Sequence, residues 1–393
     1  MCEVQEEGGA DTLMEDVLGF PEWNSLPARI HFSIIFLGVK LTDDSGRPSR
    51  MITAQDVEYH TPPNADHRWA ETFIFPIPIP EERILVMVYV VSRPKLGVML
   101  NDIYIYGTLT DNRAELLYID SQVHLPAPKR FSDIDSPSGL KLKAVNPPRE
   151  FRIDYVGFDD TEIHVDWNGV MEPFDVHDLK HTPHAVGTHE EKMARSGLSK
   201  AWNGHFDMTG RVRGTVKVRG REYPVDSLER MDHSWGERGE NDLPPMDSIS
   251  AQFDEKLAFH LIPHLDLDAP MGKDQRLAHG YVLDDGVHYG VATLDMTSNR
   301  LGVSVIAMDL TVVDVRGKTF RLQGRADVGA PWNIYATTCY TALMRWSLGE
   351  RTGYGVVMEV LPLKTLTRMR GRRGTHWPAS ITTGDRKSTR LNS

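Results

Sequence analysis

The segment "GHFDMTGRVRGTVKVRGREYPVDSLERMDHSWGER" (204–238) decides the fold class. Val212 and Val216 alternate with polar residues, and this period of two is typical of a β-strand with one buried face. Gly220 interrupts the alternation between two arginines and predicts the turn of a hairpin. The segment therefore predicts two long antiparallel strands.

Strand patterns dominate the rest of the chain as well. "RILVMVYVV" (83–91) is apolar throughout, which indicates a strand covered on both faces. Hairpins are predicted over 151–167, 279–295 and 310–324, and short strands at this spacing are typical of barrels and sandwiches. Residues 178–203 lack alternation and predict a helical linker. We therefore predict an all-β fold of two halves joined by this linker.

Composition fits a soluble globular protein of 393 residues, long enough for two domains. The formal charge of −11 disfavours nucleic acid and anionic membrane as partners. Two cysteines, Cys2 and Cys339, exclude a disulfide framework and favour a cytoplasmic location. No signal peptide or apolar run of about 18 residues is present, so no membrane span is expected.

The predicted boundaries follow from these patterns. The ending "DRKSTRLNS" resembles a translated sequencing adapter, so we expect it to be an artefact of environmental DNA assembly and give it no functional weight. We predict an acidic N-terminal segment (1–27), a first domain (28–178), the linker (179–203), a second domain (204–365) and a tail (366–393, of which 385–393 is the artefact).

The segment "ERMDHSWGER" (229–238) holds the largest variety of chemically functional side chains in a short stretch. In an extended chain His233 and Trp235 share one face, whereas Asp232 and Ser234 share the other, so these residues cannot form a triad. Histidine exchanges protons near neutral pH, and an indole stabilises a cation by on the order of 2 kcal/mol when desolvated. The pair predicts acid-promoted alkene chemistry. The alternative is a packed core in which Asp232 and Arg238 form a structural ion pair.

The same segment resembles a known signature. Its "DHSWG" motif (232–236), followed by Arg238, is similar to that of the double-lipocalin superfamily of carotenoid 1,2-hydratase and AttH-like proteins, above all an uncharacterised bacterial branch. Residues 69–98 and 344–360 resemble other parts of that branch. The resemblance implies two lipocalin-like antiparallel β-barrels packed side by side, with a pocket for a hydrophobic ligand at their junction.

What the resemblance implies about the reaction is broader. Relatives hydrate isoprenoid or prenylated compounds or shape pericyclic cyclisations, so the fold does not fix the chemistry. In the hydratases an acidic residue between aromatic residues joins the motif. Asp247 is its counterpart here, but Met246 and Ser248 replace the aromatic neighbours, which argues against a long polyene substrate.

Our leading hypothesis is a hydratase or isomerase acting on an alkene of a terpenoid, steroid-like or prenylated molecule. Asp247, kept protonated by an apolar site, protonates the alkene, and Trp235 stabilises the cation. His233 takes a proton from water, while Asp232 fixes the local backbone. The expected substrate-binding residues are Arg238, His205, Asp207, Glu71, Arg93 and Tyr354. Glu71 and Arg93 also fit a buried structural pair.

Two further function classes stay open. One is a non-catalytic binding protein for a lipophilic ligand, and the other is a pericyclase that uses donors such as Arg238 or Tyr354. No cofactor or metal is predicted, because "HEEKM" lacks the second histidine of a zinc motif although histidines cluster at positions 177, 181, 184 and 189. Phosphate-binding loops and the Gly-x-Ser-x-Gly elbow are also missing from the sequence. The expected partner is a small hydrophobic molecule; its identity and the oligomeric state stay open.

Overall fold

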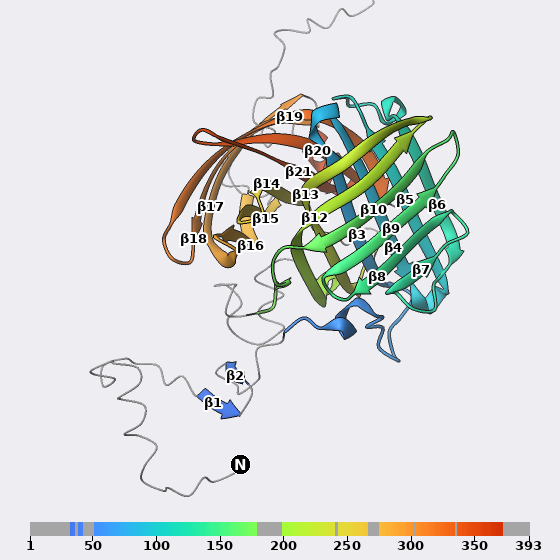
Figure 1. Cartoon of the computed structure of the whole chain (residues 1–393), viewed down its shortest axis with the longest axis horizontal. Helices are drawn as coiled ribbons and strands as arrows, with labels where there is room; N and C mark the ends of the chain where they lie inside the picture. The colour runs from blue at the N-terminus through green and yellow to red at the C-terminus, as the bar shows by residue number, and fades with distance from the viewer. Residues whose placement is uncertain are drawn as a thin grey trace, which may run out of the picture. The chain divides into compact units, whose positions relative to one another are not determined.

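The structure, a computed structural model, describes residues 32–35, 38–41, 51–178, 199–239, 243–265, 275–301, 304–334 and 336–371. Two compact units are present, residues 1–49 and 50–393. In the first unit, β1 (Phe32–Ile35) and β2 (Gly38–Leu41) form an antiparallel pair. The second unit is an assembly of two β-structures (Figure 1).

The first of these is an 11-stranded antiparallel sheet, here called the curled sheet, with the order β6-β5-β4-β3-β13-β12-β10-β9-β8-β7 and β11 paired to β12. Its inner face wraps around one hydrophobic core that draws on nearly all of its strands. The strands are β3 (Trp69–Ile79), β4 (Ile84–Arg93), β5 (Val98–Tyr106), β6 (Tyr118–Pro126), β7 (Asp133–Asp135), β8 (Leu140–Asn146), β9 (Glu150–Val156), β10 (Glu162–Gly169), β11 (Phe174–Asp175), β12 (Gly204–Val218) and β13 (Arg221–Glu237).

The second is a closed barrel of consecutive antiparallel strands, in which β14 also pairs with β21. Its interior holds a separate apolar core. The strands are β14 (Met246–Asp254), β15 (Leu257–Leu265), β16 (Gln275–Asp284), β17 (Val287–Leu301), β18 (Ser304–Asp314), β19 (Thr319–Ile334), β20 (Thr337–Leu348) and β21 (Arg351–Pro362).

Helices are few among the described residues, and none of them is long and apolar enough to cross a membrane. They are the 3₁₀ helices η1 (Ala54–Val57), η2 (Pro80–Glu82), η3 (Pro94–Leu96), η4 (Arg113–Glu115) and η5 (Ser199–Trp202) and the α-helix α3 (Leu363–Gly371). The predicted helical linker falls mostly on residues 179–198, outside the described residues; η5 is its described end.

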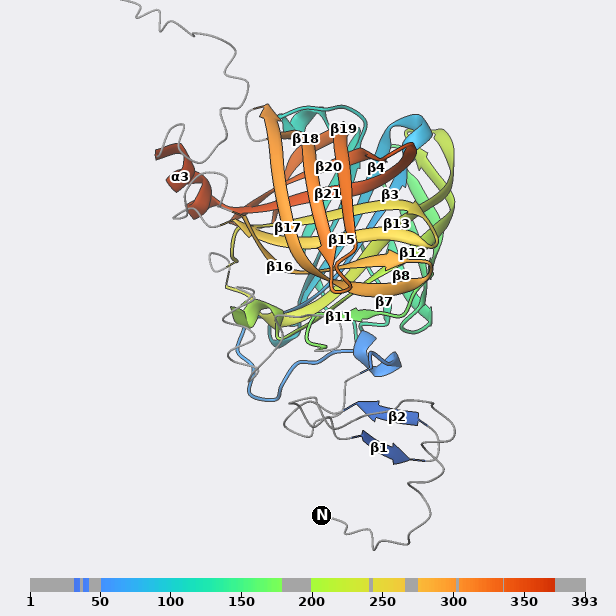
Figure 2. The same ribbon diagram turned by 90° about the vertical axis from the view of Figure 1, so that its left-hand side faces the viewer.

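The outer face of the curled sheet packs on the barrel. Tyr89 and Tyr104 contact the indole of Trp332, with ring centroids 5.6 and 5.2 Å apart. Because β4 faces one core with Val88 and this junction with Met87, it is buried on both sides, as its uninterrupted apolar sequence predicted. In Figure 2 the barrel strands β17 to β20 run steeply, whereas β12 and β13 of the curled sheet run at a shallow angle.

The all-β, lipocalin-like fold predicted from the sequence is confirmed. The hairpin turns also form where predicted, for instance at Gly220 (φ 81°) and Gly286 (φ 80°), whose positive φ angles favour glycine. However, β12 and β13, which we had placed at the start of the second domain, pair with β10 and β3 of the curled sheet. The curled sheet therefore ends at Glu237, and the barrel begins at Met246.

Candidate active site

The two faces of β13 look into different parts of the molecule. Directly opposed residues of antiparallel strands share a face. His233 lies opposite Phe73 of β3 and Phe206 of β12, and Trp235 lies opposite Glu71. Phe73, Phe206 and Trp235 belong to the core of the curled sheet. The imidazole and the indole therefore face the interior of the curled sheet, and not a cavity shared with the barrel as we had expected.

The His233 ring is enclosed by aromatic side chains and fully buried. Its Nδ1 lies 2.8 Å from the carbonyl oxygen of Thr72, so Nδ1 carries the proton and donates it. Nε2 is then the unprotonated nitrogen and carries a lone pair. It has no hydrogen-bond partner among the described residues. Ring centroids of Phe73 and Phe131 lie 4.4 and 5.5 Å away. Burial lowers the pKa of His233 to about 3, which leaves this imidazole neutral.

His60 is a second imidazole beside it, and its surroundings shift its pKa in the opposite direction. Its ring lies flat on Trp235, with centroids 3.6 Å apart and planes 3° from parallel. Its Nε2 is 3.6 Å from Asp56, and its Nδ1 is 3.4 Å from Glu71. Burial works against a positive charge, but the two carboxylates outweigh it and raise the pKa of His60 above its ordinary value. The imidazolium also gains from the indole face beneath it.

Glu71 fixes this arrangement. Its Oε1 accepts hydrogen bonds from the backbone N–H of His60 (2.7 Å), the hydroxyl of Thr61 (2.8 Å) and the indole N–H of Trp69 (3.0 Å). Burial opposes ionisation, yet these donors and the charge of its neighbours lower the pKa of Glu71. The donor atoms of His60, Glu71 and His233 lie within 4.8 Å of one another. Both ring nitrogens of His60 lie beside carboxylates, so the set fits proton transfer between His60 and its neighbours.

A second buried cluster, here called the junction cluster, lies between the curled sheet and the barrel. It consists of His205 and Asp207 of β12, His260 of β15 and His279 of β16. Asp207 Oδ2 lies 2.9 Å from His205 Nε2 and 3.6 Å from His279 Nε2, and Oδ1 lies 3.0 Å from His260 Nε2. Burial opposes ionisation of Asp207, but the imidazoles hold its pKa well below the ordinary value.

Asp232 also faces the junction, where it accepts a hydrogen bond from Arg230 (2.8 Å). The structural pair with Arg238 that we had considered is not what Asp232 forms there. The guanidinium of Arg238 donates instead to the carbonyl of Ala201 (3.1 Å) and to the hydroxyl of Ser234. Arg238 thus ties the end of β13 to η5, whereas the pair of Asp232 and Arg230 lies within β13 itself.

The structure does not bring Asp247 to His233. Asp247 lies opposite Glu359 and two positions before Ile249, so it shares a face with that side chain, which belongs to the barrel core. Alternation along β14 turns its neighbour Ser248 toward the junction, where Ser248 accepts from Arg230. Asp247 instead contributes to the electrostatic environment of the buried Arg300.

The two remaining candidates lie elsewhere. Arg93 is buried and donates to the carbonyl oxygens of Arg68 (3.0 Å) and Arg238 (3.1 Å), which is a structural contact rather than a pair with Glu71. Tyr354, on β21 opposite Gln252, packs against the apolar junction.

Sequence reasoning missed His60, His260 and His279. His60 lies in a loop before β3, where no periodicity marks it. The other two interrupt apolar strands, "LAFHLI" and "LAHGYV", and a histidine in such a strand is a signal that could have found them. Of the predicted histidine group, His177 donates from Nε2 to the carbonyl oxygen of Trp202 (3.2 Å), and His181, His184 and His189 lie outside the described residues.

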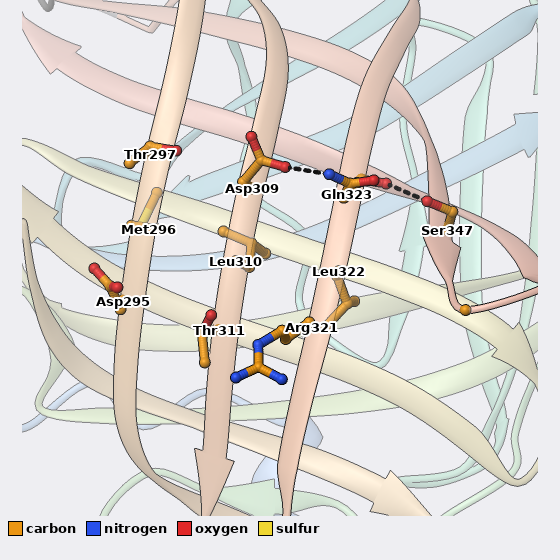
Figure 3. A pocket seen from close by; sticks show the side chains of 11 residues that line it. Asp295, Met296, Thr297, Asp309, Leu310, Thr311, Arg321, Leu322, Gln323 and Ser347 are labelled. Carbon is orange, nitrogen blue, oxygen red and sulfur yellow. Dashed lines mark hydrogen bonds between the residues drawn. The ribbon is translucent and has the colours of Figure 1, made fainter.

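A cavity of about 400 Å³ lies apart from both clusters, on β17 to β20 (Figure 3). Its exposed lining includes Asp309, Gln323 and Ser347, which a row of hydrogen bonds connects across three strands. Arg321 and Asp295 lie on the same outer face. None of the predicted site residues lines it.

Together, the curled sheet and the closed barrel define a double-lipocalin fold, as the sequence resemblance implied. A kievitone hydratase from Nectria haematococca aligns with a TM-score of 0.50 and 10% identity, over 79% of this chain and 93% of that chain. A putative AttH from Nitrosomonas europaea aligns with a TM-score of 0.49 and 13% identity, over 79% and 97%. At 10% identity, the likeness to the kievitone hydratase is one of fold alone.

The chain belongs to the family described as a domain of unknown function, DUF7064, which matches residues 53–363. No curated protein matches the sequence. The matched range includes both clusters, from His60 to His279.

Proposed function

We propose that this protein is an acid–base catalyst, a hydratase or isomerase acting on an alkene of a hydrophobic molecule inside the curled sheet. One observation carries the proposal. His60 and His233 lie with ring centroids 5.8 Å apart, and their surroundings move their pKa values in opposite directions. A pair of groups tuned apart in this way supplies an acid and a base at one pH.

In this mechanism His60 is the general acid and donates a proton to one alkene carbon. Water adds to the other carbon and gives up a proton to Nε2 of His233, so hydration consumes one water and the two histidines then exchange the proton back. In isomerisation, His233 takes the proton from a neighbouring carbon instead. Trp235 has one face covered by His60, so its role is to stabilise the imidazolium acid.

The substrate is hydrophobic because aromatic rings surround the base. Phe73, Phe131 and Phe206 enclose His233, whereas the His60 side chain keeps 16% of its surface exposed. The pair therefore extends from the rim of the site into its interior. The reaction class named for the kievitone hydratase of similar fold supports hydration as the first activity to assay.

The experiment incubates the purified full chain with kievitone, and separately with farnesol, in ¹⁸O-labelled water. A product with one labelled water indicates hydration, and an unlabelled isomer indicates isomerisation. We expect His60→Gln and His233→Gln each to lower turnover about 100-fold, the usual size of general acid–base catalysis. His164→Gln is the matched control, since His164 lies on β10 in an outer ion pair.

Turnover that survives both substitutions would remove this pair from the mechanism. Tight binding of the compounds without any conversion would favour the lipophilic binding protein instead.

A further inference from the structure

We propose that the junction cluster is a metal site, in which His205, Asp207 and His279 bind a zinc-class transition-metal ion that joins the curled sheet to the barrel. The donors come from both β-structures: His205 and Asp207 from β12, and His279 from β16. The inference is independent of the proposed function, which uses the other face of the β12–β13 pair.

The donor spacing fits a metal. One nitrogen of each histidine and one carboxylate oxygen lie within 4.8 Å of one another. In a tetrahedral zinc site with bonds of about 2.0–2.1 Å, two donors are about 3.3 Å apart. Asp207 Oδ2 lies 2.9 Å from His205 Nε2 and 3.6 Å from His279 Nε2, on either side of that value.

The cluster also leaves polar atoms without partners. Neither nitrogen of His279 has a hydrogen bond to the described protein, and the same is true of His205 Nδ1, Asp207 Oδ1 and His260 Nε2. All four residues are buried. Buried polar groups are rarely left unsatisfied, and several in one place call for an explanation. A bound cation would use the lone pair of His279 Nε2 and would replace the hydrogen bond between His205 Nε2 and Asp207 Oδ2.

His260 strengthens the case. Its Nδ1 lies 3.2 Å from the carbonyl oxygen of Ile249, so Nδ1 carries the proton and Nε2 is a lone pair. That nitrogen lies 3.0 Å from Asp207 Oδ1, yet neither atom has a hydrogen bond to the described protein. A metal ion on the carboxylate would have His260 beside it, outside the set of three donors that lie within 4.8 Å of one another.

The guanidinium of Arg230 does not neutralise Asp207 in place of a metal. Arg230 directs Nη1 to Asp232 at 2.8 Å and stays 3.9 Å from Asp207. Imidazole nitrogens with one carboxylate are ligands that zinc accepts readily, and a site closed by protein ligands is structural. An ion held by two β-structures stabilises the folded chain, because the unfolded chain has no such site.

The test is elemental analysis of the full chain, purified without a histidine tag and dialysed against zinc and then against buffer. We expect one zinc ion per chain. Asp207→Asn and His279→Gln should each lower occupancy at least about tenfold. Two matched controls should keep the metal: Asp102→Asn, a buried carboxyl on β5, and Glu71→Gln at the acid–base site.

Wild-type protein that retains no metal after dialysis would overturn the proposal and leave a proton-linked histidine–carboxylate network. Zinc lost with Glu71→Gln but kept with Asp207→Asn would overturn it as well. If the variants do not fold, the wild-type chain is loaded with cobalt instead. The absence of the absorption spectrum of tetrahedral cobalt would then contradict the metal site. The acid–base proposal is unaffected by any of these results, since its test is turnover.

Discussion

Replacing His233 should change how the stability of the protein depends on pH. The folded chain keeps this buried imidazole neutral down to a pKa of about 3, whereas the unfolded imidazole takes up a proton near its ordinary value of 6.5. The folded pKa is therefore depressed, so the contribution of His233 to stability is present above about pH 6.5 and is lost as the pH falls below it. His233→Gln removes this dependence while keeping a donor for the carbonyl of Thr72.

The size of the effect follows from the two pKa values. One pKa unit corresponds to about 1.4 kcal/mol. Between about pH 6.5 and about pH 4.5, the unfolded imidazole becomes fully protonated and the folded one does not. The free energy of unfolding of wild type, relative to that of His233→Gln, should therefore fall by about 2 kcal/mol over this range.

The assay is urea denaturation of both proteins at a series of pH values, followed by circular dichroism. His164→Gln provides a control of opposite sign, because a hydrogen bond to Asp154 raises the pKa of His164 despite some burial. The advantage of wild type over that variant should grow as the pH falls. Parallel curves for wild type and His233→Gln would refute the neutral, buried state of this base.

Two other predictions concern packing and charge. In Gly204→Ala the added Cβ would lie 2.0 Å from the indole of Trp235, so we expect about 1–3 kcal/mol of destabilisation and a shift in tryptophan fluorescence; an unchanged melting temperature would contradict this. Arg300→Met removes the guanidinium that donates to Glu359 (2.6 Å) in the barrel interior, at a cost of about 3–5 kcal/mol. Adding Glu359→Gln should recover part of the loss in thermal denaturation, and a double variant that loses the sum of both effects would argue against the pair.

The sequence allowed the β-architecture to be predicted because alternation and turn residues are local signals. The 204–225 hairpin and the doubly covered β4 follow directly from them. Local signals do not tell which sheet a strand joins. From the sequence, β13 could be the last strand of the curled sheet or the first strand of the barrel. Its pairing with β3, which is far away in the sequence, places it in the curled sheet.

The residues of the candidate active site were likewise predictable only where local patterns mark them. Alternation placed His233 and Trp235 on one face, and Glu71 was among the expected substrate-binding residues. His60 could not be predicted as the partner, because it reaches Trp235 from an irregular loop that no period describes. Asp247 was predicted by analogy, but alternation along β14 places it on the face of Ile249, toward the barrel core, and not on the face of Ser248.

The chemical density of "DHSWG" has a physical explanation in the position of β13. This strand lies between β3 and β12 and has buried surroundings on both faces. Toward the curled sheet it presents His233 and Trp235. Toward the barrel it presents Asp232, which binds Arg230, and Ser234, whose hydroxyl lies 2.8 Å from that of Thr72.

The glycine completes the motif for the same reason. A Cβ on Gly236 would lie 2.3 Å from the carbonyl oxygen of Lys200 in η5, so only glycine allows that helix to approach. The stacked ring of Trp202, the last residue of η5, in turn covers His205, with centroids 4.0 Å apart. A larger residue at position 236 would displace η5 from the junction cluster and also strain the strand that holds His233. The two clusters are thus mechanically connected through one backbone, although their chemistries are separate.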